Sequence, residues 1–390
     1  MKNKIRVCFI SHSSQKLGAE RSLLETITLL RKNIIPFVIL PKKGPLCVEL
    51  EKKNICYVII PYSWWVTSKI SLWKTVIKFF LNISMTFYIV FQIKKWRCDL
   101  VYSNTIATCV GALAAKLSSR PHIWHIREYG FEDHGLIFEW GKQRSTKLIY
   151  QLSSHCIFNS KAVRKKYLKY FPQNVSKKHS VFYQPVMLHF GKTISLSKVR
   201  KNCMILGAIR ESKGQAEAIE AIRILKEQYN CHINLYILGD GIQKYVDLLK
   251  SKVIQYDLEA NIFFIGHVDF PASWLSQADI TLVCSHNEAF GRVAVESFLL
   301  KKPTIGTSSG GTLELISSQN GLLYSPGNTS ELAEKIHTLL VDNQLCKTIA
   351  NNGHNWVKQN ISQEIYVQKL LNIMCTKSSS KSHCKMKYKY

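Results

Sequence analysis

Acidic side chains are scarce in this sequence of 390 residues. It carries 26 Asp and Glu against 53 Lys and Arg, so the formal net charge at pH 7 is +27. A charge of this size predicts an anionic partner, which can be nucleic acid, a membrane surface or a phosphorylated substrate. Nucleic acid is the least favoured of the three, because the lysines are spread along the chain and no signature of an RNA- or DNA-binding domain is present.

The twelve cysteines lack the spacing of a metal site. No C-x-x-C pair and no cluster of Cys with His occurs. Several cysteines, such as Cys8, Cys203 and Cys284, lie in apolar runs of the kind that form strands. We therefore expect no metal site, and we expect these thiols to be small buried side chains of a protein in a reducing compartment, the cytoplasm.

Long apolar runs are also missing, because none reaches the roughly 20 residues that a membrane span needs. Residues 1–10 begin with basic side chains, but only four apolar residues follow before Ser11 and His12. This pattern predicts a first strand rather than a signal peptide. The clean apolar run 79–93 is also too short, and it contains Asn82 and Gln92.

The wider segment 63–96 is rich in aromatic residues and has a narrow polar stripe at Lys74, Lys78 and Asn82. Three interpretations remain open. The first is a pair of helices packed within a domain, the second is a helix that lies on a membrane with its lysines on lipid phosphates, and the third is a transmembrane helix. In the second case the interfacial tryptophans would be Trp64, Trp65, Trp73 and Trp96.

Strands and helices alternate along the first half of the chain. The expected strands are residues 5–10, 36–40, 55–60, 99–102, 122–126 and 155–159, and the clearest helices are 19–32, 107–117 and 160–169. This alternation predicts an α/β fold with a parallel, doubly wound sheet, in which ligands bind at the carboxyl ends of the strands.

The second half repeats the same pattern after an aperiodic stretch. Strands are expected at 203–207, 233–238, 262–268, 279–284 and 303–305, with a helix at 215–229. A length of 390 residues also suggests two domains. We therefore predict an N-terminal domain at 1–185, a linker at 186–202, a C-terminal domain at 203–356, a helix at 357–375, and a basic disordered tail at 376–390.

Two glutamates flank an expected helix start in the segment 285–315. Gly291 marks the helix entry, so Glu288 lies in the loop before it and Glu296 in its second turn. The N–H groups at a helix start attract anions. One acid can then reach past a bound phosphate while the other turns back toward a ribose. The alternative is two solvated acids beside an ordinary turn.

Two cations follow the strand at 203–207. Arg210 and Lys213 precede the helix at 215–229 and stand at the carboxyl end of the strand. Such a pair suits a diphosphate, because Arg can contact two oxygens and Lys supplies a point charge. The alternative is a pair of surface cations.

Together these motifs resemble the retaining glycosyltransferases of the GT-B fold, in particular the large family 4 of bacterial sugar transferases. The matching residues are Glu288, Phe290, Gly291, Glu296, Lys302, Pro303, Gly310, Gly311 and Glu314, with Arg210, Lys213 and Gly214 earlier in the chain. The resemblance implies two Rossmann-like domains that face each other across a cleft, with the nucleotide sugar on the C-terminal domain and the acceptor on the N-terminal one. It also implies that the helix at 357–375 crosses back to the first domain.

The resemblance also assigns roles to individual residues. Glu288 would be catalytic and Glu296 would bind the ribose. The donor diphosphate would lie on Arg210, Lys213, Gly291, Arg292 and Val293. The donor sugar would lie near Ala289, Phe290 and Gly18, and the base near Gly266, His267 and Val268. No paired acids of the D-x-D type are present in the expected cleft loops, which agrees with the family's independence of metal.

The first half carries two weaker matches. His125 begins an H-x-R-E-x-G motif at the end of an expected strand and would be catalytic by resemblance, facing the donor sugar or the acceptor hydroxyl. Arg127 and Glu128 in the same motif could instead pair with each other. Gly18 lies in a loop that resembles the family's G-G-A-E loop, with Leu17 where a first Gly is usual, and a plain turn is the alternative there.

The sequence thus predicts a glycosyltransferase that needs no cofactor. Its expected partners are a nucleotide-sugar donor, a saccharide or lipid-linked saccharide acceptor of a bacterial envelope polysaccharide, and an anionic membrane surface on the inner face of the cell membrane. The basic helix at 160–169 is either a solvated face or a surface for lipid head groups or a pyrophosphate acceptor. A sugar-nucleotide epimerase of the same fold is the alternative enzyme.

Overall fold

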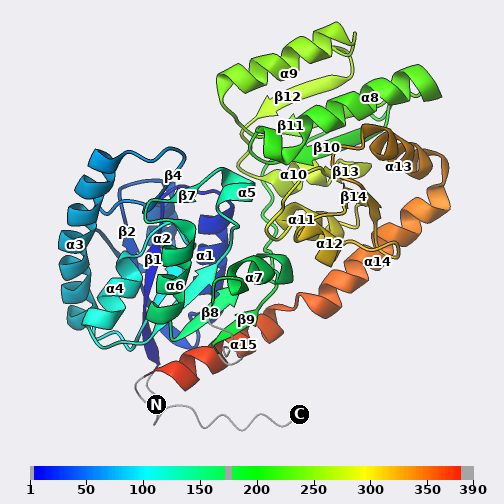
Figure 1. The fold of residues 1–390 in the computed structure, drawn as a ribbon. Coiled ribbons are helices and arrows are strands. Elements are labelled where there is room, and N and C mark those ends of the chain that lie inside the picture. The colour runs from blue at the N-terminus through cyan, green and yellow to red at the C-terminus, as the bar shows by residue number, and fades with distance from the viewer. Residues whose placement is uncertain (1–3, 172–177, 379–390) are drawn as a thin grey trace. The chain divides into compact units, whose positions relative to one another are not determined.

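The computed structural model describes residues 4–171 and 178–378, and it divides the chain into two compact units (Figure 1). Unit 1 combines residues 1–185 with residues 363–390, and unit 2 comprises residues 186–362. Each unit has its own sheet and its own buried core.

Unit 1 is built on seven parallel strands in the order β3-β2-β1-β5-β6-β8-β9. The direction of winding reverses between β1 and β5, which is where a doubly wound sheet binds its ligands. The strands are β1 (Ile5–Ser11), β2 (Ile34–Leu40), β3 (Cys56–Ile59), β5 (Leu100–Asn104), β6 (His122–Ile126), β8 (His155–Phe158) and β9 (His179–Val181), and β4 (Val66–Thr67) pairs with β7 (Ile137–Phe138) outside this sheet.

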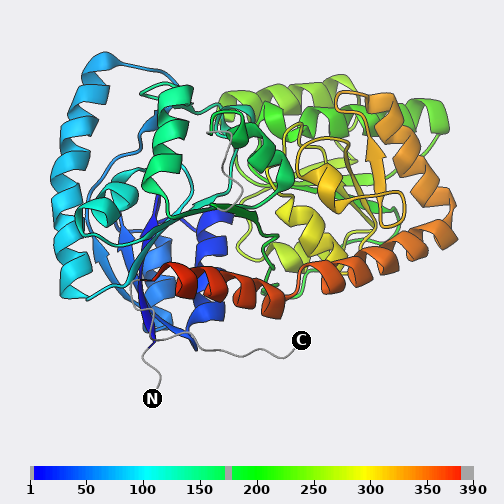
Figure 2. The same cartoon turned by 60° about the horizontal axis from the view of Figure 1, so that its bottom comes forward.

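The helices of unit 1 cover both faces of its sheet. They are α1 (Gly18–Leu30), α2 (Pro45–Lys52), α3 (Leu72–Lys95), α4 (Val110–Leu117), α5 (Phe131–His134), α6 (Lys142–Leu152), α7 (Lys161–Leu168) and α15 (Gln363–Lys377). The last of these returns to the first part of the chain and lies beside α1 (Figure 2). Tyr366 on α15 shares a hydrogen bond of 2.9 Å with Thr26 on α1, and Leu370 and Met374 join the core beneath.

The crossing helix predicted at 357–375 is two helices. The first, α14 (Asn343–Asn360), belongs to unit 2, and α15 begins only at Gln363. Ile361 between them is buried and leaves the helical conformation, with φ −124° and ψ 50°. The helix also continues through Lys377, so the predicted tail begins two residues too early. Residues 379–390 of that tail lie outside the described residues.

Unit 2 is built on six parallel strands in the order β12-β11-β10-β13-β14-β15, with its reversal between β10 and β13. The strands are β10 (Asn202–Leu206), β11 (Asn234–Leu238), β12 (Ile262–Gly266), β13 (Ile280–Val283), β14 (Thr304–Thr307) and β15 (Leu322–Tyr324). The helices, besides α14, are the 3-10 turn η1 (Glu211–Lys213), α8 (Gln215–Tyr229), α9 (Gln243–Gln255), α10 (Pro271–Leu275), α11 (Arg292–Leu299), α12 (Thr312–Leu315) and α13 (Thr329–Val341).

The stretch predicted as a linker, 186–202, is part of unit 2. Asn202 is the first residue of β10, and its buried side chain donates to the carbonyl of Ser197 and accepts from Asn234. Leu196 packs against the core on one face of the sheet. The stretch lacks periodicity because it runs as an irregular segment along the unit, which residue patterns do not distinguish from a linker.

The segment 63–96 contains a single helix, α3, after the strand β4, so the prediction of a helix pair is wrong. α3 runs for 24 residues along the outer side of unit 1, next to α4 (Figure 1). Its length and composition would allow it to cross a membrane, yet only 22% of its most apolar window is buried. Whether it spans a membrane or lies on one remains a prediction.

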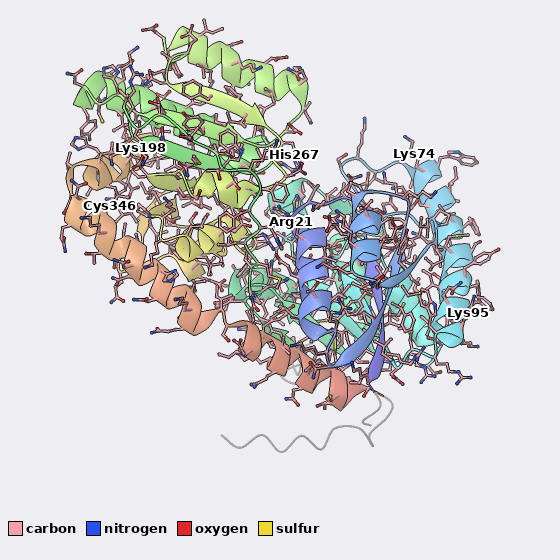
Figure 3. The ribbon with its side chains drawn as sticks, turned by 180° about the vertical axis from the view of Figure 1, so that it is seen from behind. Arg21, Lys74, Lys95, Lys198, His267 and Cys346 are labelled. Carbon is pink, nitrogen blue, oxygen red and sulfur yellow. The ribbon has the colours of Figure 1, made fainter. Side chains whose placement is uncertain are left out.

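The side of α3 that faces the domain carries both polar and apolar residues. Lys78 pairs with Glu139 and Asn82 accepts from the backbone of Ser63, whereas Ile89 and Ile93 join the core. Of the predicted polar stripe, Lys78 and Asn82 face the domain and Lys74 is exposed. The exposed large side chains are Leu72, Trp73, Val76, Ile77, Phe79, Phe80, Phe87, Tyr88 and Phe91, here called the α3 outer face. Lys74 and Lys95 lie at its two ends (Figure 3).

Two of the four tryptophans predicted at a membrane interface are placed elsewhere. Trp65 is buried, and its ring stacks on Trp124 with the centroids 6.0 Å apart. Trp96 stacks on Phe37. Both rings complete the apolar layer that covers the sheet, a role that a local pattern does not reveal. Trp73 is the most exposed tryptophan of the segment.

Ten of the cysteines are free thiols, and seven of these are buried, among them Cys8, Cys203 and Cys284. Burial raises the pKa of the Cys203 thiol above its usual range and that of Cys284 to about 12, so both stay protonated. Cys203 in β10 and Cys284 directly after β13 therefore act as small apolar side chains of unit 2.

Candidate active site

Three turns meet at the carboxyl edge of the unit 2 sheet. They follow the neighbouring strands β10, β13 and β14, and they carry residues 207–214, 284–291 and 308–311. This is the side of the strand-order reversal at which doubly wound sheets bind ligands. These turns, with the first two turns of α11, are here called the unit 2 site.

Two glycines allow the three turns to approach one another. Gly214 has φ +71°, and a Cβ there would come within 2.2 Å of the carbonyl oxygen of Cys284. A Cβ on Gly311 would come within 2.7 Å of the carbonyl oxygen of Ala289, and its N–H donates to the carbonyl of Glu288 over 2.6 Å. Larger residues at either position would push the outer turns away from the central one.

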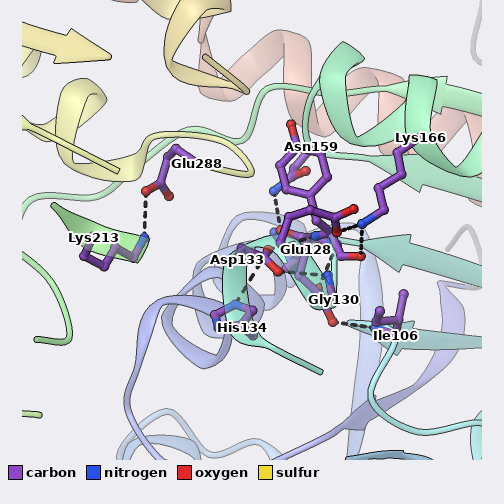
Figure 4. Close-up of polar contacts among 12 residues, drawn as sticks. Ile106, Glu128, Gly130, Asp133, His134, Asn159, Lys166, Lys213 and Glu288 are labelled. Atoms are coloured by element: carbon purple, nitrogen blue, oxygen red, sulfur yellow. Dashed lines mark hydrogen bonds and ion pairs between the residues drawn. The ribbon is translucent and has the colours of Figure 1, made fainter. Parts of the chain in front are cut away.

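The central turn carries Glu288, which is held by the β10 turn. The Nζ atom of Lys213 lies 2.7 Å from Oε2 of Glu288, and both side chains are about one-fifth exposed (Figure 4). Arg210 lies in the same β10 turn, as the residue before η1 and three residues before Lys213. The structure therefore brings one predicted cation, Lys213, to the predicted acid Glu288, and it places the second cation, Arg210, on the same turn as Lys213.

The helix that follows begins where the sequence predicts. Gly291 is the residue before α11 and has φ +95°, and Glu296 lies in the second turn. Glu296 is buried and accepts a hydrogen bond of 3.0 Å from Nε of Arg292. Because the first N–H groups of a helix have no partner within it, those at the start of α11 can donate hydrogen bonds to an anion at this edge of the sheet. Ala289 is buried, whereas Phe290 and Val293 are half-buried.

The residues predicted at the base lie at the end of β12, on the other side of the strand-order reversal. Gly266 has φ +79°, and its carbonyl accepts from Gly239 over 2.8 Å. The His267 ring is exposed, with Nε2 3.8 Å from Asp269 (Figure 3). Val268 packs in part against the core. The three therefore share the sheet edge with Glu288 but are set apart from it by β11 and β10.

A buried network next to the unit 2 site was not predicted. Glu217 on α8 accepts a hydrogen bond of 2.8 Å from the Tyr324 hydroxyl with one oxygen and contacts the His286 ring with the other. His286 lies two residues before Glu288, and its N–H donates to Ser212 over 3.1 Å. Tyr324 is buried, and burial raises its pKa far above its usual range. The sequence signal that could have indicated this network is Glu217, an acid at a position of α8 that faces the sheet.

The unit 1 site is formed by residues at the ends of β1, β5 and β6. His125 is fully buried there, its Nδ1 bonds to the hydroxyl of Tyr102, and its Nε2 has no hydrogen-bond partner among the described residues. Burial, aided by the charge of Arg127, lowers the pKa of His125 well below its usual value. The ring is therefore neutral at physiological pH.

Arg127 and Glu128 do not pair with each other's side chains. The Arg127 guanidinium donates to Asn104 and Gln184. The Glu128 carboxyl accepts the backbone N–H groups of Ile106, over 2.7 Å, and of Arg127, over 3.0 Å (Figure 4). Burial raises the pKa of Glu128 to about 8 despite these donors. Both side chains thus fix the loops that surround His125.

Gly18 is the first residue of α1, and no atom lies within 4 Å of where its Cβ would be, so the backbone is open to a ligand. Two residues later, Glu20 is buried and lies 3.3 Å from His12, which the sequence did not single out. Oε2 of Glu20 and Nδ1 of His12 have no hydrogen-bond partner among the described residues. Burial lowers the pKa of His12.

No group of three or more His, Cys, Asp or Glu side chains suited to a metal ion is found in residues 4–171 and 178–378. Both candidate sites are instead built from single acids, cations and backbone groups. The expectation of a metal-free reaction stays a prediction.

The second half of the chain matches a known family. Residues 194–356 match the profile described as Glycosyl transferases group 1. An uncharacterized glycosyltransferase of Methanocaldococcus jannaschii is 29% identical over 276 residues, which are 67% of this chain and 71% of that protein. The capsular polysaccharide biosynthesis glycosyltransferase CapM of Staphylococcus aureus is 28% identical over 167 residues, 42% of this chain and 43% of CapM.

Solved structures confirm the predicted fold class. The crystal structure of Anabaena HepE in complex with UDP-glucose superimposes with a TM-score of 0.78 and covers 95% of this chain and 100% of HepE. At 23% identity this likeness shows the fold. The two doubly wound sheets, the matched profile and the glycosyltransferase relatives agree with one another, so the chain is a glycosyltransferase with the GT-B fold, and its residues 194–356 match the glycosyl transferases group 1 family.

Proposed function

We propose that this protein is a retaining glycosyltransferase that moves a sugar from a nucleoside diphosphate to a hydroxyl group of a lipid-linked saccharide during bacterial envelope polysaccharide synthesis. The observation that carries the proposal is the ion pair of Lys213 with Glu288 in the unit 2 site, with Arg210 on the same turn as Lys213 and α11 beginning at Arg292, four residues after Glu288. HepE was crystallised with UDP and with UDP-glucose, and CapM is named for capsular polysaccharide biosynthesis. Both support the substrate class.

The leaving group is where this site can act most strongly. When the bond from the sugar to the diphosphate breaks, negative charge develops on the phosphate oxygens. Arg210, Lys213 and the N–H groups of α11 are placed to stabilise that charge, and fixed donors of this kind supply a large part of many rate enhancements. Glu296 would hold the ribose with the carboxyl oxygen that Arg292 leaves available.

Glu288 would hold hydroxyl groups of the donor sugar once Lys213 turns to the phosphate. In the front-face reaction the acceptor oxygen bonds to the anomeric carbon on the side from which the diphosphate leaves. The departing phosphate oxygen takes the proton of the acceptor hydroxyl, so the products are the glycoside and the protonated nucleoside diphosphate. No metal or other cofactor is invoked.

The membrane partner is supported by α3. Its outer face exposes nine large side chains that are apolar or aromatic, while Lys78 and Asn82 are turned toward the domain. A helix with aromatic residues on its outer side and lysines at its ends suits the boundary between head groups and acyl chains. Together with a net charge of +27, this favours a peripheral protein on the cytoplasmic face of the cell membrane.

The test is product analysis with the full chain. UDP-, GDP- and ADP-sugars are first screened by thermal shift, and the stabilising donor is incubated with lipid-linked saccharides. Release of nucleoside diphosphate that depends on acceptor, with a product of the same anomeric configuration as the donor by NMR, supports the proposal. An inverted product, or an epimerised donor without transfer, refutes it.

A further inference from the structure

Unit 1 contains a pocket that neither candidate site includes. Its volume is about 370 Å³, within the range of small-molecule sites. It lies among α5, β7, α6 and α7, all within one unit, and its walls are mainly aromatic and aliphatic. Tyr129, Phe131, Leu136, Phe138, Tyr167 and Tyr170 form most of the apolar wall.

One polar group in the wall is buried without a partner. Thr146 on α6 lines the pocket, its side chain is 1% exposed, and its Oγ1 has no hydrogen-bond partner among the described residues. A buried hydroxyl left unbonded is destabilising, because it has lost its hydrogen bonds to water without replacing them. A ligand with an oxygen at this position would satisfy it.

Two lysines at the pocket share a single acid. Nζ of Lys166 pairs with one oxygen of Glu132, and Nζ of Lys142 lies 3.9 Å from the other. Lys166 also donates to the carbonyl of Tyr129 over 3.1 Å (Figure 4). Burial lowers the pKa of Lys166 to about 8. The pocket therefore combines apolar walls with one positive charge that Glu132 does not balance.

The pocket connects two features of unit 1. Tyr129 comes directly after the H-x-R-E stretch of the unit 1 site, and its N–H is held by Asp133 on α5. Ile70, on another side of the pocket, comes two residues before the first residue of α3. A chain lying in the pocket would thus run from the α3 outer face toward the loop that follows His125.

We propose that this pocket binds the acceptor's lipid anchor: an apolar chain lies against the aromatic walls, and the phosphate that joins it to the saccharide contacts Lys142, Lys166 and Thr146. This inference rests on the proposed function and specifies its acceptor as a lipid phosphate. The apolar walls distinguish such a ligand from a free anion, and the two lysines distinguish it from a neutral lipid.

Farnesyl phosphate is a suitable probe, because it carries a short isoprenoid chain on one phosphate. Its binding to the full chain is measured by isothermal titration below its micellar concentration, with farnesol and inorganic phosphate as separate arms. Leu136→Trp fills the pocket, Thr146→Val removes the hydroxyl, and the double variant Lys142→Gln with Lys166→Gln removes the charge. Lys165→Gln, an exposed position on the same helix α7, is the matched control.

We expect farnesyl phosphate to bind the wild type and Lys165→Gln equally. Leu136→Trp and the double lysine variant should each bind at least tenfold more weakly, and Thr146→Val a few-fold more weakly. Farnesol and inorganic phosphate should each bind more weakly than the phosphate ester. Equal affinity in all variants, or inorganic phosphate binding as tightly as the ester, overturns the proposal.

Donor binding separates this inference from the proposed function. Each variant is also titrated with the nucleoside diphosphate that stabilises the wild type, and it should bind this ligand normally because the unit 2 site is unchanged. If donor binding and transfer persist while the affinity for farnesyl phosphate is the same in the pocket variants as in the wild type, only the pocket assignment fails. If no nucleoside diphosphate binds the wild type, the proposed function fails first.

Discussion

Lys213 and Glu288 form an ion pair of 2.7 Å across two turns of unit 2, although each has a different task in the proposed reaction. A bound diphosphate would draw Lys213 away and leave Glu288 available for sugar hydroxyls. The pair thus holds both side chains near their working positions before a donor arrives.

Loss of Lys213 or Arg210 should therefore reduce the stabilisation of the transition state. We expect Lys213→Ala and Arg210→Ala each to lower kcat/KM by an amount equivalent to about 2–4 kcal/mol. Lys244→Ala, which removes an exposed lysine of α9, should have little effect. Initial rates of nucleotide release measure this. Wild-type rates in both variants would contradict the diphosphate assignment, and abolition of wild-type activity by a chelator would contradict the metal-free mechanism.

Substitutions of Glu288 and Glu296 should affect different kinetic parameters. Glu288→Gln should lower kcat more than it changes donor KM, because its contacts strengthen in the transition state. Glu296→Ala should mainly raise the donor KM, since the ribose is held equally in both states. Steady-state kinetics with varied donor decide this, with Glu227→Gln on the exposed side of α8 as control. The assignment would be lost if both variants kept full activity.

The Tyr324 hydroxyl should stabilise unit 2 through Glu217. Tyr324→Phe removes a hydrogen bond to a buried carboxylate, and such bonds contribute about 1.5–3 kcal/mol. We expect the urea midpoint of the unit 2 transition to fall accordingly. Tyr229→Phe, at an exposed ring on the same helix as Glu217, is the control. An unchanged midpoint would mean that the network contributes nothing measurable.

The α3 outer face should bind anionic membranes. Each Lys or Arg near such a surface contributes about 1 kcal/mol, which salt screens, while inserted aromatic side chains add a part that salt leaves intact. We expect the protein to pellet with anionic vesicles, to be released in part by high salt, and to be released more fully by high salt in Trp73→Ala.

The control for membrane binding is Ile242→Ala, an exposed apolar residue of unit 2 that should behave as the wild type. A protein that stays in solution with anionic vesicles at low salt would remove the main support for a lipid-linked acceptor. Release by detergent alone would identify α3 as a span.

Acid should destabilise unit 1 through its buried histidines. Burial lowers the pKa of His122 to about 3 from an ordinary value of 6.5. Below pH 6.5 the unfolded chain therefore binds a proton that the folded one does not. As the pH is lowered from 6.5 toward 3, the free energy of unfolding decreases by up to about 1.4 kcal/mol per pH unit. The full contribution is present above pH 6.5.

Trp124 reports on this site, because its ring lies 5.2 Å from that of His122. Between pH 7 and pH 5, urea unfolding followed by tryptophan fluorescence should weaken less in His122→Gln than in the wild type. His189→Gln, at an exposed ring, should keep the wild-type dependence. The same pH dependence in all three proteins would rule out a contribution from His122.

The strand ends and the motifs on them were predictable because they depend on local order. A glycine at the start of α8 or α11 and acids at fixed offsets from it mark a turn wherever they occur, so the placement of Lys213, Glu288 and Glu296 on the unit 2 turns agrees with the sequence. The fold class followed from the alternation of strands and helices, and the solved structures confirm it.

The failures concern long-range packing. The sequence of residues 63–96 is mostly apolar, and it does not indicate which side of the helix faces the domain. The contact of Lys78 with Glu139, 61 residues later in the chain, shows that the Lys78 side faces the domain. Trp65 is buried by Trp124, and Glu217 is held by Tyr324, at separations that no local pattern covers. The pocket joins four elements and appears only once they are assembled.

The return of α15 to α1 makes unit 1 discontinuous in sequence, with unit 2 inserted into it. During synthesis the first 185 residues emerge early, but the helix that covers Leu23 and Ile27 follows roughly 180 residues later. At a synthesis rate of about 5–20 residues per second, that apolar surface stays uncovered for on the order of 10–40 s before α15 is made. Unit 2 is continuous and can fold in that interval, so the amino-terminal unit is the last to be completed, and truncation at its distant end would expose its core.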